Sequence, residues 1–393
     1  MDTPIVVESP ILSEDGLRLD CTIHYDANSY NIYFESDSIR LNPNMESILS
    51  LLLLPAMVLK KQIETTETVS ESFHSNLQNI QSIYRQWFIH QQLQEFSITN
   101  LPIRKNEQQK GKRIATFFSG GVDAFYTLIK NNSILTDIVF IRGFDIHQSN
   151  KYMLEKSSEL IAKAGREFDK NVITIDTNAR LFIDKFITYG KSHGAILASV
   201  SHLLTNEIGM FFIPSTDPYG ALVPYGSHPL LDPMWSSDRI KIIHDGCEST
   251  RLEKLKVISK NEFALNNLRV CFAKKENQKE FNCCTCEKCV RTMIGLHALG
   301  VLEKCKSFKK PLDLKNIYKI DVTPNKKAGY STLLYELEKF PGNEKICSAI
   351  SKIMNKPHFL KSNFLLLKNS MQKYKYRFPK FYRLLIKRTI DRD

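Results

Sequence analysis

The chain has 393 residues, 42% of them hydrophobic, and a formal net charge of +12. A chain of this size and composition can bury a full core and is expected to form two or three domains. The N-terminus lacks the basic and apolar pattern of a secretion signal. The longest apolar run, residues 48–59, contains Pro55 and is too short to cross a bilayer. We therefore expect a cytoplasmic protein without a transmembrane segment, in which residues 48–59 form a core helix.

Residues 1–110 predict a small α+β module. Short stretches of alternating apolar and polar residues predict strands, and residues 69–88 carry apolar side chains at helical spacing. No chemistry-bearing motif is visible in this part of the chain. The polar and charged stretch at residues 104–113 is typical of a linker.

Residues 111–300 alternate between apolar strands and helical patterns. The predicted strands are RIATFF (113–118), DIVFIRGF (137–144), NVITID (171–176), GMFFIPS (209–215), RIKIIHD (239–245) and LRVCF (268–272). The predicted helices between them cover residues 124–131, 152–168, 194–207 and 250–259. This alternation predicts an α/β fold with a doubly wound parallel sheet, which binds its ligands beyond the carboxyl ends of the strands.

The first of these strands runs into a glycine turn that opens a helix. The turn reads Ser119, Gly120, Gly121, Val122 and Asp123. Glycines let backbone N–H groups approach a ligand closely, and a helix N-terminus adds partial positive charge. The serine offers a hydroxyl donor, and the aspartate can hold a magnesium ion or cap the turn. We interpret the turn as a phosphate or pyrophosphate site; a tight turn without a ligand is the alternative.

Polar residues also follow the later strands, at the edge where ligands are expected. His193 and Gly194 are predicted to begin a helix and to be placed for phosphate. A proline-rich loop contains the candidate substrate residues Ser227, His228, Asp232 and Trp235. An ordered proline loop with a tryptophan that packs at the surface is the alternative for this second group.

Thr250 and Glu253 have the spacing of a capping box at a helix N-terminus. Arg251 and Lys254, in the same turn of helix, would then lie near the sheet edge. Because cations neutralise phosphate charge, we expect these two residues to contribute to catalysis together with Ser119.

Nine cysteines in a chain without a secretion signal argue against a disulfide framework. Four of them have metal-ligand spacing: Cys271, Cys283, Cys286 and Cys289. Four thiolates suit a tetrahedral zinc ion, and an iron–sulfur cluster would also accept them. Cys284 is the spare cysteine of the group. A closed four-thiolate zinc site leaves no position for water, so its role would be structural.

Residues 301–393 form a basic, helix-leaning C-terminal region, with 22 Lys and Arg against 8 Asp and Glu. The tail at residues 368–392 could contact nucleic acid or an anionic membrane surface. A solvated helix that keeps the protein soluble is the alternative. Whether the chain forms a homo-oligomer stays open.

The glycine turn resembles the Ser-Gly-Gly-x-Asp-Ser motif of the N-type ATP pyrophosphatases, also called the PP-loop superfamily. The resemblance implies a fold like that of the adenine nucleotide alpha hydrolases, with ATP and Mg²⁺ bound at the turn. Members cut ATP between the α and β phosphates and adenylate a carbonyl or carboxylate oxygen. The last motif position, usually Ser or Thr, is Ala124 here, so one phosphate-facing hydroxyl is missing.

The cysteine pattern is similar in order and spacing to that of 7-cyano-7-deazaguanine synthase-like proteins. There, a lone Cys precedes Cys-Gly-x-Cys-x-x-Cys-x-x-Arg, and the four cysteines bind structural zinc. In this chain Cys284 replaces the glycine, and Arg291 comes one residue early. The two motifs together cover about residues 113–300.

The resemblance implies an ATP-dependent, AMP-forming ligase or amidating enzyme that acts on a small molecule and releases pyrophosphate. Two alternatives stay open. An RNA-modifying enzyme of the same superfamily would use the basic C-terminus to hold tRNA. A non-catalytic nucleotide-binding protein would account for Ala124.

Overall fold

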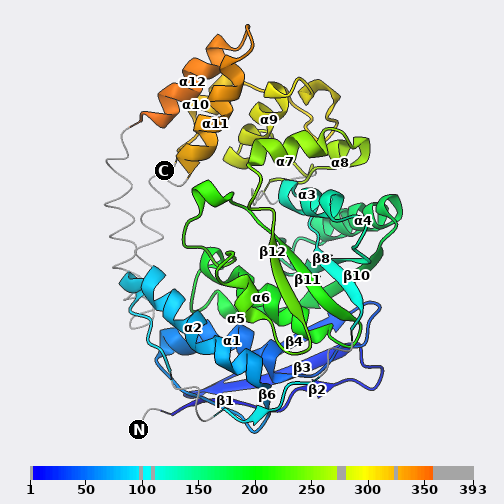
Figure 1. Cartoon of the computed structure of the whole chain (residues 1–393), viewed down its shortest axis with the longest axis vertical. Coiled ribbons are helices and arrows are strands. Elements are labelled where there is room, and N and C mark those ends of the chain that lie inside the picture. Colours follow the sequence, from blue (N-terminus) through cyan, green and yellow to red (C-terminus); the bar gives the residue numbers. More distant parts are fainter. Residues whose placement is uncertain (1–2, 97–100, 108–110, 272–279, 323–325, 357–393) are drawn as a thin grey trace.

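The computed structural model describes residues 3–96, 101–107, 111–271, 280–322 and 326–356. The chain has a mixed α/β fold around a ten-stranded, mostly parallel sheet (Figure 1). The strand order is β12-β11-β8-β9-β10-β4-β3-β1-β5, and β2 pairs with β3 at one side. The five strands β12 to β10 in this order are parallel to one another.

The parallel strands correspond to five of the six predicted ones. Their bounds are β8 (Arg113–Phe117), β9 (Asp137–Arg142), β10 (Asn171–Thr177), β11 (Ile208–Pro214) and β12 (Lys241–Asp245). The helices that follow them are α3 (Val122–Lys130), α4 (Lys151–Phe168), α5 (Ala179–Ile183), α6 (Tyr189–Leu203), α7 (Arg251–Ile258) and α8 (Glu262–Asn266).

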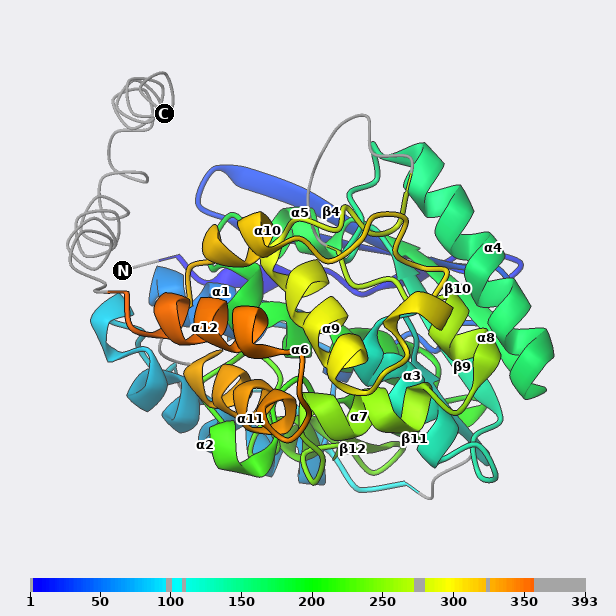
Figure 2. The ribbon, with the colours of Figure 1, turned by 90° about the horizontal axis from the view of Figure 1, so that it is seen from above.

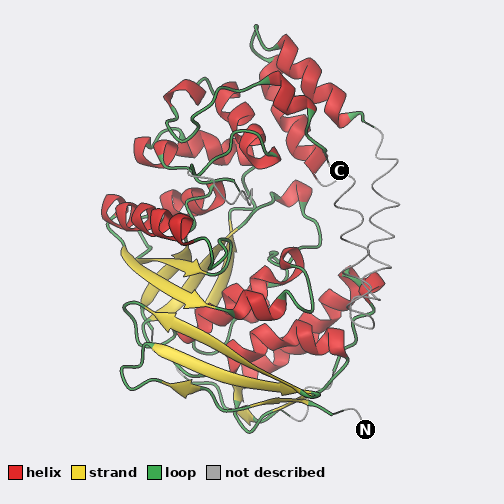
Figure 3. Cartoon of the chain, turned by 180° about the vertical axis from the view of Figure 1, so that it is seen from behind, coloured by secondary structure: helices red, strands yellow, loops and turns green. Residues whose placement is uncertain are grey.

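The N-terminal segment extends the same sheet. Its strands are β1 (Ile5–Val7), β2 (Ile11–Leu12), β3 (Arg18–Tyr25), β4 (Asn28–Ser36) and β5 (Ile63–Glu64). β4 pairs antiparallel with β10, so strands from either side of residue 110 form one twisted sheet (Figure 3). The helices of this segment are α1 (Met45–Leu59) and α2 (Glu71–Trp87), and a separate two-stranded sheet joins β6 (Val69–Ser70) to β7 (Ile103–Arg104).

Helices cover both faces of the parallel strands, and each face has its own apolar core. Side chains alternate along a strand. Ile138 and Phe140 of β9 therefore join the core under α3 and α4, while Val139 and Ile141 join the core under α1 and α6. The apolar run at residues 48–59 lies within α1, whose residues are buried as far as Met57, as predicted for a core helix. No helix in the described part of the chain is long and apolar enough to cross a bilayer.

The C-terminal helices pack beside the carboxyl end of the sheet. They are α9 (Glu287–Ala298), α10 (Leu314–Tyr318), α11 (Lys327–Glu338) and α12 (Glu344–Met354). Val290 and Ile294 of α9 share an apolar cluster with Leu252 of α7 and with α10 to α12. Seen from above, α9 lies beside α7 and α11 (Figure 2). The predicted basic tail at residues 368–392 lies outside the described residues.

The sixth predicted strand, LRVCF, is wrong over its described residues 268–271, which form an irregular segment. The backbone N–H groups of this segment donate to acceptors outside the sheet. Leu268 N–H donates to Ser307 Oγ, Arg269 N–H to the Gly120 carbonyl, and Val270 N–H to Asn282 Oδ1. These bonds replace a strand ladder and hold the segment against the glycine turn.

Candidate functional site

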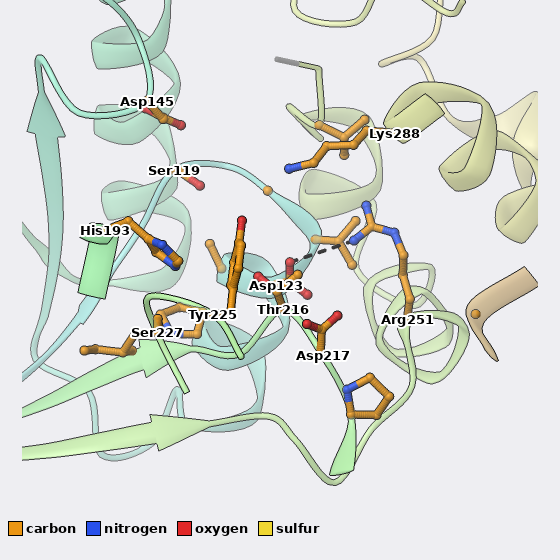
Figure 4. Close-up of a pocket in the computed structure, with 18 of the residues that line it drawn as sticks. Ser119, Asp123, Asp145, His193, Thr216, Asp217, Tyr225, Ser227, Arg251 and Lys288 are labelled. Atoms are coloured by element: carbon orange, nitrogen blue, oxygen red, sulfur yellow. Dashed lines mark ion pairs between the residues drawn. The ribbon is translucent and has the colours of Figure 1, made fainter. Parts of the chain in front are cut away.

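The cavity that marks the site lies where the parallel strand order reverses. β8 lies between β9 and β11, so the connections from β8 and from β11 leave the sheet at adjacent points. Ligands of open α/β sheets bind at such switch points, outside the carboxyl ends of the strands. A cavity of about 490 Å³ occurs here, lined by the glycine turn after β8 and by Thr216 and Asp217 after β11 (Figure 4).

The glycine turn has a backbone conformation at Gly120 that favours glycine. Gly120 has φ +75°, and a Cβ there would come 2.9 Å from a methyl group of Leu160. Arg269 holds the turn from behind, since its N–H donates to the Gly120 carbonyl at 2.7 Å and its Nε to the Ser119 carbonyl at 2.8 Å. The Arg269 guanidinium also pairs with Asp145. Gly121 is the N-cap of α3 and has no side chain, so the helix N-terminus can receive an anion from the cavity.

Asp123 is the centre of the charged part of the cavity. Its carboxylate lies 3.2 Å from Lys254 Nζ and 3.8 Å from Arg251 Nη1. Asp217 lines the same space, and burial followed by the charge of Asp123 raises its pKa. The two carboxylates provide oxygen ligands of the kind that Mg²⁺ prefers.

One end of the cavity, which we call the cationic end, is formed by four basic side chains: Arg251, Lys288, Arg291 and Lys326. Burial, and then the charge of Arg291, lowers the pKa of Arg251 to about 10. Burial, and then the charge of Arg251, lowers the pKa of Lys288 to about 8. Glu287 balances part of this charge, at 2.9 Å from Arg291 and 3.1 Å from Lys326. An anionic ligand would stabilise the protonated forms here.

Of the two predicted catalytic cations, Arg251 lines the cavity and Lys254 lies behind it. Lys254 is almost fully buried, and its Nζ donates to the Ser215 carbonyl at 2.6 Å. The predicted capping box of Thr250 and Glu253 is present at the start of α7. It orients the first turn of α7, from which Arg251 extends into the cavity.

The four predicted metal ligands converge. The thiol groups of Cys271, Cys283, Cys286 and Cys289 all lie within 4.8 Å of one another. Two of the sulfur pairs are 3.6 and 3.9 Å apart. A tetrahedral ion with Zn–S bonds of about 2.3 Å requires sulfur pairs about 3.8 Å apart. The cluster can therefore hold a metal such as zinc.

Cys284, the spare cysteine, faces away from this cluster. Its Sγ contacts the Asn282 carbonyl at 3.6 Å, and its φ of +60° is a conformation that favours glycine.

The cysteine cluster lies next in sequence to two residues that line the cavity. Arg269 lies two residues before Cys271, and Lys288 lies between Cys286 and Cys289. The cluster thus joins the two segments that present these cations.

The other end of the cavity, the aromatic end, is formed by Tyr189, His193, Tyr225 and Ser227. The His193 ring stacks on Tyr189 with centroids 5.2 Å apart and lies 4.6 Å from the Tyr225 ring. Helix α6 begins at Tyr189, so His193 and Gly194 lie inside the helix and not at its start, contrary to the prediction. A Cβ on Gly194 would meet the Gly226 carbonyl at 2.0 Å, and this glycine is needed for helix–loop packing.

The predicted substrate loop divides between the cavity and the core. Ser227 lines the cavity, and Asp232 is buried behind it, bonded to Ser227 Oγ and to His244 Nδ1 at 2.6 Å each. His228 packs edge-on against Trp87, at 4.7 Å between centroids, and does not line the cavity. Trp235 is fully buried in the core beneath α2, so it does not line the cavity, nor does it pack at the surface as the alternative predicted.

Sequence reasoning missed several residues that line the cavity: Asp217, Tyr189, Tyr225, Lys288, Lys326 and Arg269. For two of them, Arg269 and Lys288, the sequence did carry a signal, since both lie beside cysteines that have metal-ligand spacing. Comparison of the chain with family models, with curated proteins and with solved structures finds no match.

Proposed function

We propose that this protein is an AMP-forming, ATP-dependent ligase of the N-type ATP pyrophosphatase superfamily, with a doubly wound sheet and a structural zinc ion. The proposal rests on three features that lie together in one cavity. These are a glycine turn ending in Asp123, the switch point between β8 and β11, and the cationic end. A triphosphate needs this combination of backbone donors, a helix N-terminus and several cations.

In the proposed reaction, a carboxylate or carbonyl oxygen of the substrate attacks the α-phosphorus of ATP. The bond to the β-phosphate oxygen breaks, and pyrophosphate leaves. A nitrogen or sulfur nucleophile then attacks the adenylated carbon and displaces AMP. Mg²⁺ would neutralise phosphate charge, and Asp123 and Asp217 are the residues that would hold it. Arg251 and Lys288 stabilise the charge that develops on pyrophosphate.

The test is pyrophosphate release by the purified protein with ATP, Mg²⁺ and fractionated metabolite pools. The proposal predicts pyrophosphate and AMP in equal amounts in the presence of the right fraction. Formation of ADP and inorganic phosphate in place of these products would overturn the proposed mechanism.

A second candidate function is RNA modification by the same chemistry. The turn and loop after α9 expose Lys304, Lys306, Lys309 and Lys310, a basic surface that suits phosphates. RNA binding that falls steeply with salt and is weakened by Lys306→Gln and Lys309→Gln would favour this candidate. A third candidate, nucleotide binding without catalysis, rests on Ala124, whose side chain lines the cavity. It predicts that Ala124→Ser increases turnover.

A further inference from the structure

The aromatic end differs from the rest of the cavity because the side chains that form it carry no net charge at neutral pH. Tyr189, His193 and Tyr225 pack on one another as stacked and tilted rings, and Phe144 packs on Tyr189 at 5.3 Å between centroids. The surface that these rings present to the cavity is called the slot. In Figure 4, His193, Tyr225 and Ser227 lie on the side of the cavity opposite Arg251 and Lys288. Such a slot fits a planar group.

The hydrogen-bonding role of His193 is determined by its surroundings. Its Nδ1 lies 3.1 Å from the Tyr189 carbonyl, which can only accept, so Nδ1 carries the hydrogen. Burial lowers the pKa of His193 to about 4, which keeps the ring neutral at neutral pH. Nε2 is then an acceptor. The described residues give it no hydrogen-bond partner, and the side chain lines the cavity although it is nine-tenths buried.

The role of Ser227 is determined in the same way. Its hydroxyl donates to Asp232 Oδ2 at 2.6 Å, and a buried carboxylate beside a histidine accepts this hydrogen. His244 Nδ1 also lies 3.4 Å from Ser227 Oγ and occupies one side of this oxygen. The Ser227 oxygen therefore presents its remaining lone pair, and not its hydrogen, to the cavity that it lines. The two tyrosine hydroxyls can each donate or accept and do not decide the polarity. The side chains with a determined role at this end are both acceptors.

We infer that the aromatic end binds a planar group with N–H donors, such as an amide, an amidine or an amino-substituted ring, on the substrate that the proposed ligase adenylates. The assignment to this substrate rests on the proposed function; the polarity of the slot does not. The adenine of ATP also carries an amino group beside an accepting nitrogen, so the experiment below includes adenosine as a competitor. An acceptor facing His193 Nε2 or Ser227 Oγ would be repelled.

The experiment uses benzamide, which carries two N–H donors on a planar ring, and N,N-dimethylbenzamide, which carries none. Binding of each to the full chain is titrated by ligand-observed NMR, with and without ATP. The inference predicts that benzamide binds about 3- to 10-fold more tightly, the range expected for one net hydrogen bond. Ser227→Ala and His193→Phe should each weaken benzamide about 2- to 10-fold and leave the dimethyl compound unchanged.

Thr332→Val is the matched control, since Thr332 lines the opposite wall on α11 and its hydroxyl bonds within its own helix. Equal binding of the two amides by the unsubstituted chain would overturn the inference without any variant. Displacement of benzamide by adenosine would also overturn it, because the slot would then belong to the nucleotide base. Preference for benzamide without pyrophosphate release from any substrate would support the slot and count against the proposed function alone.

Discussion

The glycine turn lines the cavity, and the cysteine cluster joins the two segments that carry the cavity residues Arg269 and Lys288, but the two regions are held in different ways. The turn is five consecutive residues, and its shape comes from Gly120 at φ +75° and from hydrogen bonds donated by Arg269. The cluster joins two segments separated by residues 272–279, and its four thiols approach one another without disulfide bonds between them. The turn is held by the chain's own hydrogen bonds, whereas the cluster could be held together by a bound metal ion. The two should therefore fail under different treatments.

The largest expected effect is loss of the metal. Cys289→Ala removes one of four ligands, and the three remaining thiolates would repel one another around a weakly held ion. We expect the unfolding free energy to fall by more than about 5 kcal/mol, with melting of α9 first, measured by denaturant titration and by metal content. Cys284→Gly is the matched control, because this thiol faces away from the cluster and its φ suits glycine. A full metal content in Cys289→Ala would contradict the assignment.

The next effect concerns the turn. Asp123→Ala removes the carboxylate nearest Lys254 and Arg251, at 3.2 and 3.8 Å, and leaves the backbone of the turn in place. We expect pyrophosphate release to fall about 100- to 1000-fold with little change in the melting temperature. The metal content should stay the same, in contrast to Cys289→Ala. Asp169→Asn, at an exposed helix end, is the control for a general effect of lost charge.

The third prediction concerns neither region but the buried His244–Asp232 pair behind the aromatic end, and it is a prediction about stability against pH. Burial opposes protonation of His244, but its hydrogen bonds to Asp232 and Cys247 raise its pKa to about 9. The pair therefore stabilises the fold fully below pH 6.5, and this stabilisation is lost as pH rises from 6.5 to 9. We expect the unfolding free energy to fall by up to about 3 kcal/mol across this window. His244→Gln should flatten the profile; an unchanged slope in this variant would rule out the pair as its source.

The smallest effect tests the backbone of the turn. Gly120→Ala puts a side chain at φ +75° and brings it to 2.9 Å from Leu160. We expect about 1–2 kcal/mol lower unfolding free energy, together with weaker ATP binding. Gly329→Ala is the matched control for stability alone, because this glycine lies inside α11, where a Cβ meets no described atom within 4 Å, but it lines the cavity. The control should be neutral or up to about 1 kcal/mol more stable. Equal stability of both variants would show that the turn is not constrained.

Much of the α/β region could be predicted because its periodicities are local. Five predicted strands are present as β8 to β12, and the predicted helices at residues 69–88, 124–131, 152–168 and 250–259 match α2, α3, α4 and α7 within a few residues. Helix α6 begins five residues earlier than predicted, because Tyr189 to Lys191 look like loop residues in the sequence. The antiparallel pairing of β4 with β10 could not be predicted, since nothing local selects a partner strand.

The sequence by itself determined the glycine turn and the metal ligands. Both are short patterns in which backbone freedom or sulfur chemistry restricts the residue type. Only the tertiary structure decided that α11 brings Lys326 to the cavity, that Tyr189 and Tyr225 frame His193, and that Trp235 lies in the core. A lysine, a tyrosine or a tryptophan can serve on a surface, in a core or in a site. Its role is set by long-range packing of elements, which leaves no periodic mark in the sequence around it.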